Sequence, residues 1–247
     1  MSSQDGRSPF AKDTYGRQTL RPLNCLVFIL PLLAVFHVGT AFYGSDLLAP
    51  RDIDSILGYF GVTVAYLPAM LVVVVLLLQH VAHREKFRVQ GRVLAGMLGE
   101  SICWVLPLIA MAHLTNRLLL HQAGADQGSD AASGVFPLLI SGVGAGIYEE
   151  FIFRMVLISL SLVVFVDVFD LHKDTVAIVS VIAAAIAFSL YHFSVKQIAE
   201  LSTFPWYDFI FRAVAGVYLG SLYVFRGFGI AVGVHSIYNI YTVLYNM

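Results

Sequence analysis

Long apolar runs, separated by short polar segments, constrain the fold of this chain more than any other feature. A helix that spans a bilayer needs about 20 consecutive, predominantly apolar residues. By that rule the sequence predicts spans at residues 23–43, 53–79, 94–120, 135–168, 175–193, 208–225 and 228–245. The fourth run is long enough to divide into two half-helices. We therefore expect an all-α fold, a polytopic membrane helix bundle of about seven to eight transmembrane helices.

The composition agrees with an integral membrane protein. Of the 247 residues, 58% are hydrophobic and 13% are charged, whereas soluble domains carry roughly 25% charged residues. The formal net charge is −1, and the basic residues occur in short clusters instead of a long tract. This pattern gives no basis for nucleic acid as a partner. The lipid bilayer is the first partner that the sequence predicts.

Basic residues flank the first two predicted spans on one side. They lie before the first span, at Arg7, Lys12, Arg17 and Arg21, and after the second, at Arg84, Lys86, Arg88 and Arg92. Two crossings separate these clusters, so the positive-inside rule predicts a cytoplasmic N-terminus. The first span is longer than the apolar region of a signal peptide, and we expect it to stay uncleaved.

A polar linker at residues 122–134, rich in Gly, Ala, Ser and Asp, precedes the half of the chain that carries the unusual polar residues. We expect one integral membrane domain over residues 1–247, with a motif-bearing core at 135–245. Three G-x-x-x-G pairs in this core predict close packing of helix backbones. They are Gly142 with Gly146, Gly216 with Gly220, and Gly229 with Gly233.

Three charged residues interrupt the fourth apolar run, in the segment Glu149-Glu150-Phe151-Ile152-Phe153-Arg154. A charged side chain at the bilayer centre costs roughly 2.5 to 3.5 kcal/mol, so such residues are paired, hydrated or functional. Glu150 and Arg154 share a helix face at i and i+4, and we expect them to form an ion pair. Glu149 would then face a cavity as a general base. A purely structural ion-pair cluster is the alternative.

Two later runs carry histidines with aligned companions. Phe188 and His192 lie at i and i+4, as do His235 and Asn239. A carboxylate base, two imidazoles and an amide donor are the groups needed to activate water against a carbonyl and to stabilise the oxyanion. The sequence therefore predicts that these residues meet in one buried active site.

Other polar residues in the apolar runs have simpler interpretations. His37 and His113 lack aligned companions, and we interpret them as hydrogen-bonded packing residues. Asp208 and Arg212 lie at i and i+4, and we expect them to pair near a membrane surface. A substrate role for Arg212 is the alternative.

The ordered set EExxxR, FxxxH and HxxxN, on successive C-terminal helices, resembles the three motifs of the CPBP family of intramembrane proteases. This family includes the CAAX prenyl endopeptidases and bacteriocin-processing or self-immunity relatives. The resemblance covers roughly residues 135–245 and implies an endopeptidase that acts on a peptide or protein substrate at the membrane. The residues that it implies as catalytic are Glu149, His192, His235 and Asn239, and those that it implies as supporting are Glu150, Arg154 and Phe188.

The resemblance also implies a division of roles among the catalytic residues. Glu149 would activate water with His192 as its partner, and His235 with Asn239 would stabilise the oxyanion. No cofactor is expected, because the sequence has no H-E-x-x-H and Asn239 suits an amide donor. The alternative is a zinc-dependent protease, with Glu149, His192 and His235 as ligands and an open fourth position.

Two functions other than proteolysis are also compatible with the sequence. One is a non-catalytic membrane immunity or scaffold protein of the same fold. The other is a proton-coupled transporter, which internal repeats would favour, but we find none in the sequence. The compact length fits a multi-pass protein of a bacterial plasma membrane.

Overall fold

The computed structural model describes residues 14–43, 67–119, 134–200 and 202–245, and every regular element in these ranges is helical. The all-α prediction is therefore confirmed for this part of the chain. The elements are α1 (Tyr15–Thr19), α2 (Pro22–Tyr43), α4 (Leu67–Ala82), α5 (Gly91–Leu119), α6 (Val135–Glu150), η1 (Phe151–Ile158), α7 (Ser159–Leu162), η2 (Val163–Val168), α8 (Lys173–Tyr191), α9 (Val195–Ala199), α10 (Trp206–Arg226) and α11 (Phe228–Tyr245).

Six helical stretches in the described ranges are long and apolar enough to cross a bilayer. They are Pro22–Tyr43, Gly91–Thr115, Val135–Val168, Lys173–Tyr191, Trp206–Arg226 and Phe228–Tyr245. Each corresponds to one predicted run. The remaining predicted run, at 53–79, lies only partly within the described residues, where α4 forms a shorter apolar helix. The prediction of a multi-pass membrane bundle is confirmed.

The fourth run forms one continuous helical rod. α6 passes directly into η1, where the backbone widens into a π-helix, and the rod continues through α7 and η2 to Val168. The alternative of two half-helices is wrong, because no Gly or Pro lies between Gly146 and Val168 to break the rod. Single-turn π-bulges occur often at functional sites. This longer π segment begins directly after Glu149 and Glu150.

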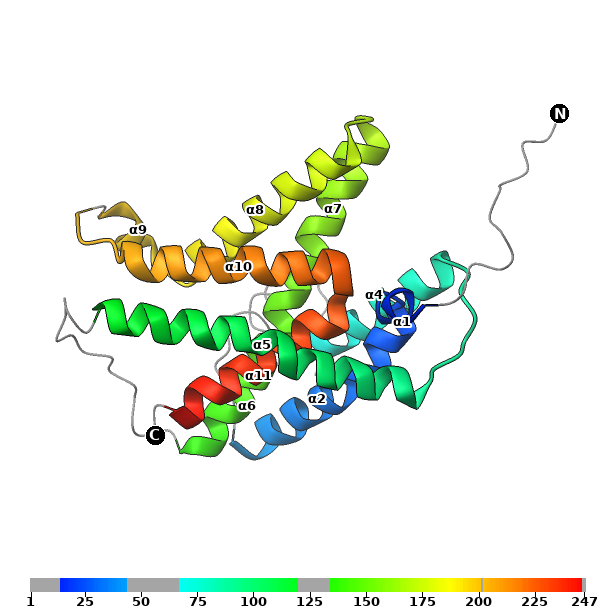
Figure 1. Ribbon diagram of the computed structural model, residues 1–247, viewed down its shortest axis with the longest axis horizontal. Helices are drawn as coiled ribbons and strands as arrows, with labels where there is room; N and C mark the ends of the chain where they lie inside the picture. Colours follow the sequence, from blue (N-terminus) through cyan, green and yellow to red (C-terminus); the bar gives the residue numbers. More distant parts are fainter. Residues whose placement is uncertain (1–13, 44–66, 120–133, 201, 246–247) are drawn as a thin grey trace.

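Helix α11 lies at the centre of the bundle (Figure 1). It packs against α2, α5, α6 and α10, while α8 packs against α10 and η1. Every residue of α11 from Phe228 to Ser236 is buried. A polar side chain in this stretch, such as His235, must find its hydrogen-bond partners inside the protein. The central position of α11 thus decides which groups can surround its histidine.

The three G-x-x-x-G pairs mark places where helix backbones approach closely. A Cβ atom on Gly146 would lie 2.8 Å from the backbone nitrogen of Ser236 in α11, and one on Gly216 would lie 2.9 Å from Cα of Ala185 in α8. Real Cβ atoms essentially never come this close to another atom. The predicted close packing is confirmed, and it brings α6, α8 and α10 to the residues of the site.

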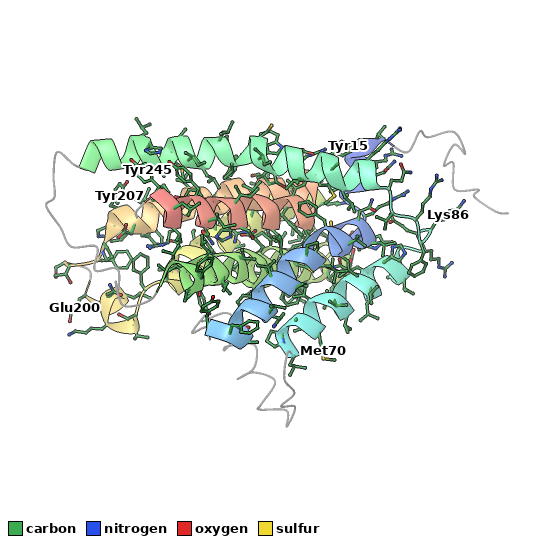
Figure 2. All side chains as sticks on the ribbon, turned by 90° about the horizontal axis from the view of Figure 1, so that it is seen from below. Tyr15, Met70, Lys86, Glu200, Tyr207 and Tyr245 are labelled. Carbon is green, nitrogen blue, oxygen red and sulfur yellow. The ribbon has the colours of Figure 1, made fainter. Side chains whose placement is uncertain are left out.

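Where the structure describes them, the residues of the two basic clusters lie at the same end of the bundle. Nε of Arg21 lies 3.6 Å from a carboxylate oxygen of Glu85, which belongs to the second basic segment. Figure 2 shows Tyr15 and Lys86 at this end, and Tyr207 and Tyr245 at the opposite end. The arrangement fits two crossings between the clusters. That this end faces the cytoplasm stays a prediction.

Candidate active site

The ion pair between Glu150 and Arg154 is fully buried. Their side chains are 0% and 1% exposed, and Nη1 of Arg154 lies 3.0 Å from Oε1 of Glu150. The guanidinium also lies over the ring of Phe188, 4.4 Å from its centroid, and Nη2 donates to the carbonyl of Gly216 at 3.3 Å. The predicted pair is therefore present, and its arginine contacts both α8 and α10.

Glu150 has a second partner that the sequence did not predict. Oε1 of Glu150 lies 2.7 Å from Nδ1 of His235, which comes from α11. A carboxylate paired with Arg154 only accepts hydrogen bonds, so Glu150 accepts this one and Nδ1 of His235 donates it. This contact leaves Nε2 as the free nitrogen of the His235 imidazole.

The second histidine is oriented in the same way. Nδ1 of His192 lies 2.8 Å from the carbonyl oxygen of Phe188, one turn earlier on α8. A carbonyl oxygen only accepts, so Nδ1 donates and Nε2 again stays free. The ring of Phe188 stands edge-on to both imidazoles, with centroid distances of 4.9 Å to His192 and 6.0 Å to His235. Phe188 thus packs against both imidazole rings.

Glu149 lies between the two free nitrogens. Oε1 lies 3.8 Å from Nε2 of His192, and Oε2 lies 3.8 Å from Nε2 of His235, with the carboxylate side chain 13% exposed. Both separations exceed the length of a hydrogen bond. When the imidazoles are neutral, the two nitrogens and the two oxygens all present lone pairs to a common space. Such a set of acceptors suits a molecule with two O–H donors, as water is, or a cation.

Asn239 lies one turn beyond His235 on α11. Its Nδ2 donates to the carbonyl of Gly142 on α6 at 3.0 Å. An amide nitrogen carries two hydrogens, so this bond fixes the side chain and leaves a second N–H. The close approach of α6 and α11 at Gly142 is what makes the bond short enough to form.

A cavity of about 350 Å³ opens beside these groups, between α5, α8, α10 and α11. His192, His235 and Asn239 line it together with Phe188, so the structure brings the second and third motifs to one space. Glu149 is not part of the lining but reaches the same two imidazoles. The cavity extends to Tyr207 and Tyr245, which Figure 2 shows at one end of the molecule.

His37 and His113 are hydrogen-bonded, as predicted. Nε2 of His37 lies 2.9 Å from the hydroxyl of Tyr148, and Nε2 of His113 lies 2.5 Å from the hydroxyl of Tyr241. His113 and Tyr241 also line the cavity, which sequence reasoning missed. No spacing rule connects His113 to α11, because these residues lie far apart in the chain.

The predicted pair of Asp208 and Arg212 does not form. No ion pair joins Arg212 to Asp208 or to any other carboxylate in the described part of the chain; instead its guanidinium lies 5.4 Å from the ring centroid of Phe193. Asp208 is exposed. A hydrated carboxylate gains little from an exposed ion pair, so the helix spacing alone does not enforce one.

The zinc alternative can be compared with this geometry. Zinc holds nitrogen and oxygen ligands at about 2.0 to 2.2 Å. Among the residues that the structure describes, no group of three His, Cys, Asp or Glu side chains is arranged to hold a metal ion. The hydrogen bonds at both Nδ1 atoms would nevertheless suit histidine ligands that bind through Nε2. Zinc therefore stays an alternative for experiment.

Comparison with known proteins agrees with the motifs. Residues 131–241 match a family model described as Rce1-like, type II CAAX prenyl endopeptidase Rce1-like. The matched range contains all three motifs, from Glu149 to Asn239. No curated protein and no solved structure matches the chain. Residues 131–241 of this multi-pass membrane protein are therefore similar to the Rce1-like type II CAAX prenyl endopeptidases.

Proposed function

We propose that the protein is an intramembrane endopeptidase that hydrolyses a peptide bond with water activated by Glu149. The observation that carries the proposal is the approach of Nε2 from both His192 and His235 to opposite oxygens of Glu149, each at 3.8 Å. A water molecule held in this space would donate to the carboxylate and to an imidazole. Its oxygen would then be free to attack a substrate carbonyl in the cavity.

The proton and the charge can be followed through the reaction. Glu149 takes a proton from the attacking water and returns it to the leaving amine, with His192 as its partner. The tetrahedral intermediate carries a negative oxygen, which the second N–H of Asn239 and a protonated Nε2 of His235 would stabilise. Glu150, at 2.7 Å from Nδ1 of His235, holds this imidazole with Nε2 directed toward Glu149.

A covalent acyl intermediate is not part of the proposal. The hydroxyl of Ser189, which lies in the second motif, donates to the carbonyl of Phe209 at 2.7 Å. That bond serves helix packing between α8 and α10. Attack by water is the simpler chemistry for a site built from a carboxylate, two imidazoles and an amide.

Cleavage of a defined peptide pool by the purified protein tests the proposed activity. We expect new N-termini at one position of each cleaved peptide, and a wild-type protein that binds members of the pool without cleaving them would favour the immunity or scaffold alternative. Exhaustive chelation with elemental analysis tests the role of zinc. We expect activity to persist with well under about one zinc per chain; activity lost with stoichiometric zinc and restored by it would favour the three-ligand alternative.

A further inference from the structure

Arg212 is a cation at the candidate site, and within the described ranges it has no carboxylate partner. It lies on α10, is partly buried, and lines the cavity together with His192, His235 and Asn239. Its contact in the described part of the chain is the ring of Phe193, and no ion pair is formed there. A charge in a membrane-spanning helix is costly unless it is paired, hydrated or used.

Two other arginines of the bundle are paired with carboxylates. Arg154 lies 3.0 Å from Glu150, and Arg226 donates to both carboxylate oxygens of Glu100, at 2.5 and 2.7 Å. Arg212 and Arg226 are on the same helix, so the difference does not come from the local backbone. Arg212 differs because it faces the cavity.

Further hydrogen-bond donors surround Arg212. Tyr207 and Tyr238 line the same cavity, and neither hydroxyl has a partner in the part of the chain that the structure describes. The charge of Arg212 also acts on both Tyr238 and His192, which places it near the proposed site of hydrolysis. Asp208 is the opposing charge, because it also lines the cavity one turn before Arg212; it is exposed and forms no ion pair with Arg212.

We propose that Arg212 binds a carboxylate of the peptide substrate and thereby selects which peptides are cleaved. This inference rests on the proposed peptidase function. A guanidinium forms bidentate hydrogen bonds to a carboxylate, and the two tyrosine hydroxyls can add donors. A cavity of about 350 Å³ admits only a short segment of peptide, so the carboxylate must lie close to the scissile bond. It can belong to the C-terminus of a short leaving peptide or to an acidic side chain.

Matched peptide libraries distinguish these sources. One short-peptide library is made with a free C-terminal carboxylate and again as the amide, and a second pair exchanges Glu for Gln near the cleaved bond. Cleavage and binding are measured for the wild type, Arg212→Gln and Arg212→Lys. The control is Arg226→Gln, which removes an arginine from the same helix outside the cavity.

We expect the wild type to prefer one carboxylate form by about 10- to 100-fold in kcat/KM, chiefly through KM, as for hydrogen bonds to a charged group. Arg212→Gln should reduce this preference to near unity. Its kcat/KM should fall for peptides with the carboxylate and stay unchanged for their neutral counterparts. Arg212→Lys should keep part of the preference, and Arg226→Gln should keep all of it. The free-acid pair and the Glu pair then show which carboxylate is bound.

Two results would overturn the inference: an unchanged preference in Arg212→Gln, or an equal loss for charged and neutral peptides. Peptide binding is measured separately, so the role of Arg212 can be tested even if no peptide is cleaved. Binding that depends on the carboxylate and on Arg212, without any cleavage, would contradict the peptidase proposal alone. Cleavage that ignores the carboxylate would contradict the role of Arg212 alone.

Discussion

The two ends of α10 place an arginine in opposite surroundings. At the end near α1, the Glu100 carboxylate accepts hydrogen bonds from Arg226, from Trp104 at 2.9 Å and from Tyr15 at 2.8 Å. At the other end, Arg212 lines the cavity and has no carboxylate partner among the residues that the structure describes. Two arginines of one helix can therefore have different roles. Arg226 joins helices through Glu100, whereas Arg212 is available to bind a ligand.

Tyr15 shows how complete the pairing is at the Glu100 end. Burial and the adjacent Glu100 carboxylate raise the pKa of Tyr15 to about 12. Its hydroxyl therefore stays protonated and remains a donor across the physiological pH range. The guanidinium of Arg226 also lies 5.5 Å from the Tyr15 ring centroid. These contacts attach the short helix α1 to α5 and α10.

The same contrast exists between the two adjacent glutamates. Glu150 is paired with Arg154 and buried, whereas Glu149 faces two imidazole nitrogens and has no Arg or Lys within ion-pair distance among the described residues. We expect Glu149→Gln to lower kcat by about 10² to 10⁴, because the amide cannot accept the proton of water. Its thermal unfolding should match the wild type. Wild-type turnover in this variant would remove Glu149 from the mechanism.

Glu150→Gln should have the largest effect on stability. It leaves the buried Arg154 without its counter-charge, and removing one partner of a buried ion pair costs about 3 to 5 kcal/mol. Thermal unfolding in detergent should show a clear loss relative to both the wild type and Glu149→Gln. Equal melting temperatures for the two glutamate variants would show that the structural and the chemical carboxylate had been assigned incorrectly.

Asn239→Ala tests the oxyanion donor. We expect kcat to fall by about 10² to 10³, with KM nearly unchanged, because the second N–H would act only in the transition state. Since Asn239 also binds the carbonyl of Gly142, unfolding must be measured on the same sample. A large rise in KM with an unchanged kcat would instead indicate substrate binding by the amide.

The smallest effect is expected at the Glu100 end. Glu100→Gln keeps the size of the side chain but weakens its bonds to Arg226 and Tyr15, for a loss of about 1 to 2 kcal/mol in unfolding free energy. Turnover per folded molecule should not change, because this cluster is outside the cavity. Lost turnover at full stability would contradict the separation of the two ends of α10.

Much of this arrangement follows from periodicity. Apolar runs predicted the spans, and the i and i+4 rule predicted the pair of Glu150 with Arg154. The same rule was wrong for Asp208 and Arg212, because it describes proximity on a helix but not which way each side chain turns to reach water, a ring or a ligand. Contacts between distant helices had no local signal.

The bond between Glu150 and His235 is the clearest such case. The two residues lie 85 positions apart, and only the packing of α6 against α11 brings them together. The π-helix after Glu150 is likewise absent from any simple pattern, because apolar residues at helical spacing do not distinguish an α-helix from a locally widened one. The order of the motifs indicated which residues meet. The hydrogen bonds that assign Nδ1 of His235 and His192 as donors became visible only in the folded structure.

Single-turnover cleavage in H₂¹⁸O tests the central claim most directly, that water held between Glu149 and the two imidazoles attacks the peptide bond. With the protein in excess over a cleavable peptide, mass spectrometry of product and protein follows the oxygen. The proposed reaction predicts one solvent oxygen in the new C-terminal carboxylate of the product, no label in Glu149 and no covalent peptide adduct. A peptide adduct on the chain, or ¹⁸O incorporated into the Glu149 carboxylate, would contradict it.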